Sequence, residues 1–215
     1  MYVQGRRDHG HAGRPMKIAI IGAGNVGGAL AAQWAKLGHT VTVAGRDQEK
    51  TKAKAQQVGA AAAAPKDAVK DADVVVFAVP SANLVEVAKE LGDLVGKIVI
   101  DATNIIGPAA RTTESPALAL AKALPGAKVV KTFNTAFAQI HDETTGLRER
   151  PSQVLVGDDA GAKDMVKVLI EEAGFEPFDA GGLDMAPDLE GFARITISLA
   201  YGPGKKGPFF YYFKR

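Results

Sequence analysis

Residues 17–27, Lys-Ile-Ala-Ile-Ile-Gly-Ala-Gly-Asn-Val-Gly, form the stretch that decides the fold. Its run of apolar residues predicts a buried strand, and the glycines that follow have the spacing Gly-x-Gly-x-x-Gly. Each glycine has its own physical task, because Gly22 makes a tight turn, Gly24 lets the backbone approach an anion, and Gly27 allows close packing of helix on strand. A helical segment and a second strand, Thr40 to Val43, follow at the expected distance. The stretch therefore predicts a β-α-β unit of the dinucleotide-binding type.

A pyrophosphate group is expected at the start of the helix that follows this turn. Unpaired backbone N–H groups and the helix dipole favour an anion at that position. We therefore expect the turn and the first helical residues to hold the pyrophosphate and its neighbouring ribose; these residues are Gly22, Ala23, Gly24, Asn25, Val26 and Gly27.

The residues after the second strand predict which dinucleotide binds. NAD sites usually carry an acidic residue here for the ribose 2′-hydroxyl, whereas this chain has Gly45 and Arg46, with Lys50 one turn further on. An acid would repel a 2′-phosphate, and a guanidinium can bind it bidentately. The pair favours NADP(H), with Arg46 as the first contact and Lys50 as the second. The alternative is that both side chains are merely solvated and that the neighbouring Asp47 leaves NAD open.

Composition narrows the class of protein. The 215-residue chain is long enough for one large domain, and 47% hydrophobic residues suffice for a buried core. A net charge of +2 gives no sign of a nucleic-acid-binding surface. The chain has no cysteine, so disulfides and thiolate metal sites are excluded, and it has no apolar run of membrane-spanning length. We expect a cytoplasmic protein with small-molecule partners, no nucleic-acid or membrane partner and no metal.

Residues 1–15 differ from the rest of the chain. They are rich in Gly, Arg and His, have no apolar segment typical of a signal peptide, and precede Met16 at the start of the first strand. We expect this segment to be a disordered extension or a tag remnant.

The alternation of apolar strands and helices continues to the end of the chain. Further strands are predicted at residues 73–80, 97–101, 128–133, 153–157 and 175–179, and helices at 52–58, 84–91, 115–124, 160–173 and 188–200. Residues 60–64, all alanine, are interpreted as a helix end or a loop. Continuous apolar strands separated by helices predict an α/β fold with a doubly wound, parallel (Rossmann) sheet of about eight strands. We expect a nucleotide-binding domain over 16–182 and a small C-terminal helical and loop portion over 183–215.

The carboxyl ends of the predicted strands are where ligands collect in such a sheet. The candidate residues there are Ala78, Val79 and Pro80, then Asn104, then Asn134 and Thr135. The first three offer an apolar wall for a cofactor. The polar residues could equally serve as turn formers through side-chain to backbone hydrogen bonds.

The sequence resembles the F420-dependent NADP oxidoreductase family from Met16 to the C-terminus. The features that carry this resemblance are Ile-Gly-Ala-Gly-Asn-Val-Gly at 21–27, Gly45-Arg46, Asp-Ala-Thr-Asn at 101–104, Lys-Thr-Phe-Asn-Thr at 131–135, Leu189-Glu190, and Leu-Ala-Tyr-Gly at 199–202. The resemblance implies direct hydride transfer between the nicotinamide of NADP(H) and C5 of coenzyme F420, an 8-hydroxy-5-deazaflavin. Both carriers supply their own reactivity, so no catalytic side chain is required beyond those that position them.

The resemblance also implies roles for particular residues. Arg46 would hold the 2′-phosphate, and Val79 and Pro80 the inner part of the nucleotide. The deazaflavin would lie between the nucleotide domain and the C-terminal portion, against Asn134 and Thr135. Family members often form homodimers through this end of the chain, which the five consecutive aromatic residues at 209–213 also favour.

Two other functions fit the same sequence pattern. The nucleotide site could serve an NADPH-dependent reductase of a flavin, a quinone or a ferric acceptor, or a non-catalytic NADP(H)-sensing module. A hydroxy-acid dehydrogenase is disfavoured because such enzymes normally provide a lysine or histidine base, and Lys131 lies within a predicted strand.

Overall fold

The structure is a computed structural model that describes residues 14–105, 114–144 and 147–214, without the side chains of 140–142. Most of the expected N-terminal extension, residues 1–13, lies outside the described residues. The strands are β1 (Lys17–Ile21), β2 (Thr40–Ala44), β3 (Ala61–Ala62), β4 (Val74–Phe77), β5 (Ile98–Asp101), β6 (Lys128–Lys131), β7 (Ser152–Gly157) and β8 (Glu176–Asp179). The α-helices are α1 (Asn25–Lys36), α2 (Gln48–Val58), α3 (Pro65–Lys70), α4 (Leu84–Leu91), α5 (Pro116–Ala123), α6 (Ala160–Glu172) and α7 (Ala186–Tyr201). Short 3₁₀ helices are η1 (Ser81–Asn83), η3 (Ala138–Thr144) and η4 (Leu183–Met185).

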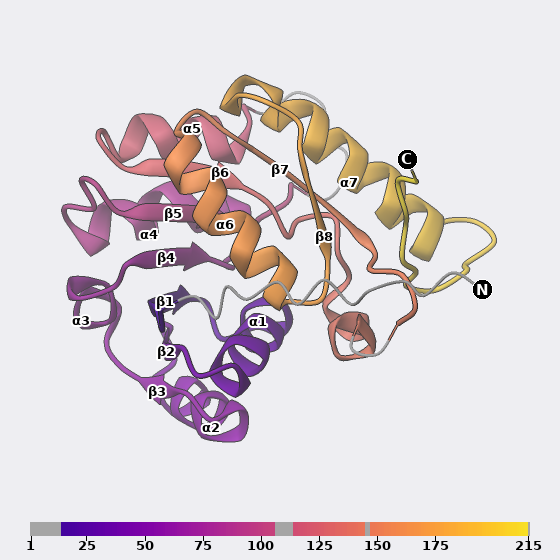
Figure 1. Cartoon of the computed structure of the whole chain (residues 1–215). Helices are drawn as coiled ribbons and strands as arrows, with labels where there is room; N and C mark the ends of the chain where they lie inside the picture. Colours follow the sequence, from indigo (N-terminus) through magenta and orange to yellow (C-terminus); the bar gives the residue numbers. More distant parts are fainter. Residues whose placement is uncertain (1–13, 106–113, 145–146, 215) are drawn as a thin grey trace.

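These strands form one sheet in the order β3-β2-β1-β4-β5-β6-β7-β8, which confirms the predicted α/β doubly wound fold (Figure 1). The order reverses between β1 and β4, so a crevice opens there at the carboxyl ends of the strands. Phe77 of β4 pairs with Asp101 of β5, and Asp101 pairs with Lys131 of β6. This register brings the carboxyl ends of three strands to the same edge of the sheet.

Two expectations about the sheet were wrong. β7 runs antiparallel to β6, because the connection carries the short η3, which packs on α1, in place of a crossover helix on the sheet. The alanine run is not only a helix end or loop, because Ala61 and Ala62 pair with Thr42 and Val43 to form the edge strand β3. An edge strand of two small, exposed residues shows no alternation of apolar and polar side chains, so the sequence pattern does not reveal it.

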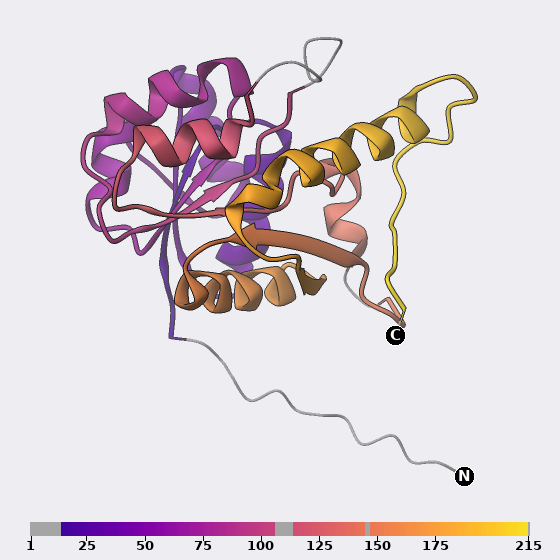
Figure 2. The same ribbon diagram turned by 90° about the horizontal axis from the view of Figure 1, so that it is seen from above.

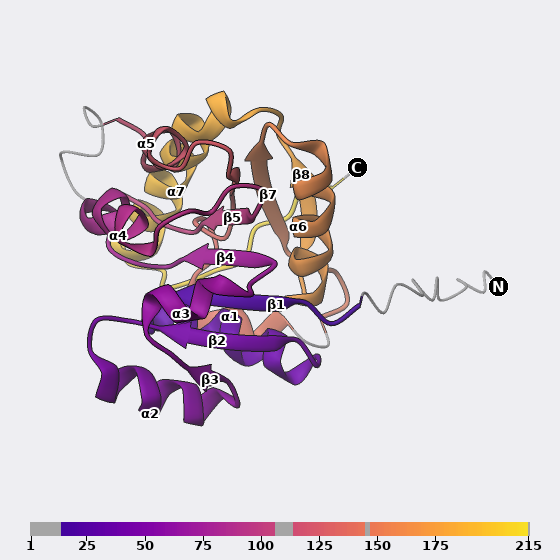
Figure 3. The same ribbon diagram turned by 90° about the vertical axis from the view of Figure 1, so that its left-hand side faces the viewer.

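The hydrophobic core lies on both faces of the sheet. Helices α1 and α6 cover one face, and α3, α4 and α5 cover the other, as Figure 3 shows. Trp34 of α1 is fully buried, and its indole N–H donates to the carbonyl of Leu169 in α6 at 3.1 Å. Phe133 packs edge-on against this ring at 5.7 Å between centroids. Because alternate residues of each strand face opposite layers, both layers are fixed by the same apolar strands.

The chain after α7 returns to the sheet at the start of β7 (Figure 2). The Ser152 N–H donates to the Tyr211 carbonyl at 2.9 Å, and the Phe213 N–H donates to Ser152 Oγ at 2.7 Å. Tyr211 also packs edge-on against Phe192 of α7, at 5.0 Å between ring centroids. The aromatic tail is thus partly buried against its own chain. In the described part of the chain, no helix combines the length and hydropathy needed to cross a membrane.

Candidate functional site

The glycines of the first turn fit their expected tasks in packing. Gly22 has φ +118°, and a Cβ there would lie 2.3 Å from the Ala78 carbonyl oxygen. A Cβ on Gly27 would lie 2.0 Å from the Gly22 carbonyl oxygen and 3.1 Å from Ile20 Cγ2. The two contacts with carbonyl oxygens, at 2.3 and 2.0 Å, are closer than Cβ atoms come, so only glycine permits this turn and this approach of α1 to β1.

Gly24 differs from these two glycines because a Cβ there would meet no atom within 4 Å. It is the N-cap of α1, so the first backbone N–H groups of this helix receive no side-chain cap. The first turn of α1 also has no acidic residue. Open space, unpaired donors and the positive end of the helix dipole together suit an anion such as pyrophosphate.

A pocket of about 390 Å³ opens at this turn, between the carboxyl ends of β1, β2 and β4. It is lined by Ile21, Gly22, Ala23, Gly24, Gly45, Arg46, Asp47, Lys50, Thr51, Pro65, Ala78, Val79, Pro80, Asn83, Val87 and Glu90. The structure therefore brings together most of the residues expected to contact the cofactor. Of the others, Gly27 is buried behind the turn, and Asn25 lines a neighbouring hollow between α1 and α2. Val26 and Asn104 are not among the residues that line the pocket.

Sequence reasoning missed the far wall of this pocket. Asn83, Val87 and Glu90 line it from η1 and α4, and Pro65 lines it from the start of α3. The three α4-side residues are spaced by four and three positions, so they share one helical face. That spacing, directly after the predicted apolar wall at Val79, was the signal available in the sequence.

The two basic residues of the pocket have different surroundings. Asp47 is the N-cap of α2: its Oδ1 accepts from the Lys50 N–H at 3.1 Å, and its Oδ2 lies 3.5 Å from Lys50 Nζ. The Lys50 backbone N–H lowers the pKa of the Asp47 carboxyl. Arg46 is exposed, and within the described residues its guanidinium has no hydrogen bond or ion pair. Asp47 is therefore occupied with the helix and Lys50, while Arg46 is available to an anion.

A second polar cluster lies at the carboxyl ends of β5 and β6. Lys131 Nζ is fully buried and lies 2.8 Å from Asp101 Oδ2, 3.2 Å from Glu190 Oε1 of α7, and 2.8 Å from the Thr103 carbonyl, to which it donates. Ser115 Oγ donates to the same Glu190 oxygen at 2.8 Å. The lysine thus donates hydrogen bonds to Asp101 and to the Thr103 carbonyl and forms an ion pair with Glu190. Lys131 thereby links α7 to the ends of β5 and β6 and is fully buried among these partners.

Next to this cluster, Asn134 and Asn104 form a pair. The side-chain nitrogen of Asn104 donates to the backbone carbonyl of Asn134 at 2.5 Å, and the side-chain nitrogen of Asn134 donates to Asn104 Oδ1 at 3.1 Å. Asn134 also donates to the Leu189 carbonyl of α7 at 3.4 Å. The preceding residue, Phe133, is fully buried with φ +60°, a conformation that a bulky side chain rarely adopts and that the packing must hold.

Thr135 joins the C-terminal tail and not an open pocket. Its Oγ1 lies 2.6 Å from the Tyr211 hydroxyl, and the Gln153 amide nitrogen donates to Thr135 Oγ1 at 3.2 Å. Burial raises the pKa of Tyr211 to about 12. The structure therefore brings Asn134 and Thr135 beside α7 and the tail, but it does not bring them into the pocket at the glycine turn.

The strand order, together with a glycine-lined crevice at the β1–β4 reversal, defines a dinucleotide-binding protein of the Rossmann class. Residues 17–105 match the model of a family described as NADP oxidoreductase, coenzyme F420-dependent. The resemblance in the sequence is thereby confirmed over this segment, in which the chain is similar to that family of NADP oxidoreductases.

Solved structures extend the likeness over most of the chain. A protein from Arthrobacter sp. FB24, provisionally described as an F420-dependent NADP-reductase, is 29% identical with a TM-score of 0.80 over 93% of this chain and 100% of its own. The hypothetical protein SMa0349 from Sinorhizobium meliloti is 29% identical with a TM-score of 0.70 over 93% of this chain and 96% of its own. A reductive aminase from Aspergillus terreus, solved with NADPH4, cyclohexanone and allyl amine, shares the fold at 23% identity, with a TM-score of 0.67 over 88% of this chain and 62% of its own.

Proposed function

We propose that this NADP oxidoreductase transfers a hydride between NADP(H) and coenzyme F420. The observation that carries the NADP(H) part is the exposed Arg46 guanidinium, which lines the same pocket as the open space at Gly24. A dinucleotide with its pyrophosphate at Gly24 would have its 2′-phosphate near Arg46, because β1 and β2 are neighbouring strands. The family match supports F420 as the second carrier.

In this proposal different residues bind different parts of the cofactor. The turn Gly22–Gly27 holds the pyrophosphate and neighbouring ribose, Arg46 and then Lys50 hold the 2′-phosphate, and Ala78, Val79 and Pro80 form the apolar wall. Asn104 lies further along the same strand-end edge. Asn134, Thr135 and the C-terminal portion 183–215 border the second carrier, supported by the contacts of Asn134 and Thr135 with α7 and the tail.

Hydride transfer requires little of the protein beyond the alignment of the two rings. A hydride leaves C4 of the dihydronicotinamide for C5 of the deazaflavin, and a solvent proton completes the reduced deazaflavin, so NADPH becomes NADP⁺. The protein's contribution is to hold the two rings in contact at about 3–3.5 Å and to keep water away. This requirement fits a site in which the lysine, Lys131, is fully buried and bonded to Asp101, Thr103 and Glu190 within the protein.

The test mixes purified protein with NADPH and oxidised F420 and follows the absorbance of the deazaflavin, with NADH as the control. We expect rapid bleaching with NADPH and slow bleaching with NADH. NADPH binding without bleaching would contradict the F420 assignment. The same protein would then be assayed with flavin, quinone and ferric acceptors, and inactivity with all of them would indicate an NADP(H) sensor.

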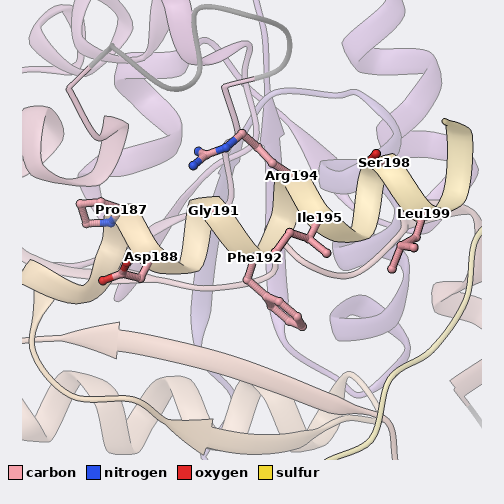
Figure 4. Close-up of a pocket in the computed structure, with 8 residues that line it drawn as sticks. All are labelled: Pro187, Asp188, Gly191, Phe192, Arg194, Ile195, Ser198 and Leu199. Atoms are coloured by element: carbon pink, nitrogen blue, oxygen red, sulfur yellow. The ribbon is translucent and has the colours of Figure 1, made fainter.

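We also propose that the protein is a homodimer whose subunits meet along the outer face of α7. Figure 4 shows the side chains along this face, where a hollow of about 670 Å³ lies over Gly191. Ile195 and Leu199 are 58% and 56% exposed, which is unusual for neighbouring apolar residues on one helix. Asp188 and Arg194 stand three positions before and after Gly191. Two antiparallel α7 helices crossing at Gly191 would therefore place Asp188 opposite the partner's Arg194.

The dimer is tested by light scattering coupled to size-exclusion chromatography. We expect Ile195→Glu to convert a dimer into a folded monomer, because it buries a charge in the contact, one helical turn from the crossing point at Gly191. Met165→Glu is the matched control, since Met165 is also exposed, at 42%, but lies on α6. A wild-type monomer, or a dimer that survives Ile195→Glu, would contradict the proposal.

A further inference from the structure

The side chain of Asn104 is held in a single orientation. Its side-chain nitrogen faces the backbone carbonyl of Asn134, and its side-chain oxygen faces the side-chain nitrogen of Asn134. A rotation of the Asn104 amide by 180° would set oxygen against oxygen and nitrogen against nitrogen, so the network itself decides which atom is which. Asn104 is therefore a pre-oriented amide and not a freely rotating one.

This amide retains unused hydrogen-bonding capacity. A primary amide carries two N–H donors and two acceptor lone pairs, and Asn134 uses one of each. Among the described residues, the second N–H and the second lone pair of Asn104 have no partner. The Asn104 side chain is only half-buried, whereas Asn134 is 5% exposed. Asn104 thus retains one acceptor lone pair and one N–H for a ligand.

The position of Asn104 follows the expected course of the cofactor. Arg46 follows β2, the glycine turn follows β1, Val79 follows β4 and Asn104 follows β5, and these strands are neighbours in that order. Adjacent strands are about 4.8 Å apart, so this edge spans roughly 14 Å, the scale of an extended dinucleotide. A dinucleotide with its 2′-phosphate at Arg46 and its pyrophosphate at Gly24 would bring its nicotinamide end toward β5.

We propose that the Asn104 side-chain oxygen accepts a hydrogen bond from the carboxamide N–H₂ of the nicotinamide ring and so fixes which face of the ring is presented for hydride transfer. The carboxamide N–H₂ is the donor that complements the free lone pair on the Asn104 oxygen. Asn134 is the positioning residue that orients Asn104 and does not itself touch the cofactor. This inference rests on the proposed NADP(H) function and adds the residue that recognises the reacting end of the cofactor.

The surroundings of Asn134 explain why it can act as a rigid support. It is tied to the Leu189 carbonyl of α7, and α7 is in turn anchored by the ion pair between Glu190 and the buried Lys131. On its other side, the strained backbone of Phe133 is held by burial against Trp34. Because neither neighbour can move without breaking buried contacts, the Asn134 amide is fixed on both sides.

The test compares NADPH with reduced 3-acetylpyridine adenine dinucleotide phosphate, in which a methyl group replaces the carboxamide nitrogen. Dissociation constants are measured by fluorescence titration. We expect the wild-type protein to prefer NADPH by roughly tenfold, the size of one lost hydrogen bond. In Asn104→Leu this preference should fall to near one. A tenfold preference that persists in Asn104→Leu overturns the assignment.

The positioning role of Asn134 is tested by the same ratio. We expect Asn134→Ala to lower the preference to about threefold or less although Asn104 is intact, and equal weakening of both cofactors would overturn this role. Asn134→Gln, which keeps the buried amide but displaces it, should act in the same direction if Asn134→Ala folds poorly.

2′-Phospho-ADP-ribose, which lacks the nicotinamide, should bind wild-type protein and every variant equally. Its failure to bind wild-type protein would refute the NADP(H) site itself. Its normal binding, combined with unchanged ratios in the variants, would refute only the role of Asn104.

Discussion

The carboxyl ends of β1, β2 and β4 and those of β5 and β6 lie along one edge of the sheet, but their polar groups are satisfied differently. At the first group, backbone donors and the Arg46 side chain face an open pocket. At the second, Lys131, Asp101 and Glu190 are buried and bonded to one another. The donors of the first region are therefore available to a ligand, whereas the polar groups of the second region bind one another and hold α7 in place.

This difference indicates a division between binding and support. Open donors at a helix N-terminus contribute little to folding but can gain charge-assisted hydrogen bonds from an anion. A buried ion cluster gives a ligand nothing directly, yet breaking it leaves charges without partners. Substitutions in the two regions should therefore separate, with loss of affinity in the open region and loss of stability in the buried one.

The largest effect is expected at Lys131. Lys131→Met removes the partner of two buried carboxyl groups and should lower the free energy of unfolding by about 3–5 kcal/mol, measured by urea denaturation. Lys167 is the matched control, because it also lies between two carboxylates, 3.1 Å from Asp164 and 3.2 Å from Asp179, but its side chain is 33% exposed. Lys167→Met should cost less than about 1 kcal/mol. Equal losses of unfolding free energy in Lys131→Met and Lys167→Met would contradict the expected difference between buried and exposed charges.

Charge reversal at Arg46 should give the largest effect on affinity. Arg46→Glu places an acid where the 2′-phosphate is expected, so the Kd for NADPH should rise roughly 100-fold, and the Kd for NADH less than about threefold. Lys52→Glu is the control, since Lys52 is an exposed α2 residue that does not line the pocket. Equal losses for the two cofactors would count against the 2′-phosphate role.

A smaller change in affinity is expected at Gly24. Gly24→Ala should weaken NADPH binding roughly tenfold, because the added methyl group enters the space proposed for the pyrophosphate. Its free energy of unfolding should change by less than about 1 kcal/mol, since φ is −76° and nothing lies within 4 Å. Gly22→Ala, in contrast, should lower the free energy of unfolding of the ligand-free protein, because its Cβ would meet the Ala78 carbonyl. Thermal unfolding and fluorescence titration of both variants measure the two effects separately.

The same contrast explains what the sequence could predict. The glycine turn, Arg46 and the apolar wall at Val79 lie within short segments whose spacing is a local signal, and the fold class follows from the alternation of apolar strands and helices. The antiparallel β7 and the partners of Lys131 depend on contacts between residues at least 25 positions apart, such as Lys131 with Asp101 and Glu190. No local pattern encodes those pairings, so Lys131 could be recognised only as a lysine in a strand.

The smallest expected effect concerns the tail and depends on pH. Burial raises the pKa of Tyr211 to about 12, against about 10 in an unfolded chain, so between these values the folded protein keeps a proton that the unfolded chain releases. Stability from this group is therefore complete below pH 10 and is lost as pH rises toward 12. Tyr211→Phe should cost about 1 kcal/mol at pH 8, through the lost hydrogen bond to Thr135, and progressively less above pH 10. Urea denaturation of both proteins from pH 8 to 11.5 measures this convergence. Parallel curves would show that Tyr211 titrates normally, and hence that the tail does not stay packed against Thr135 in solution.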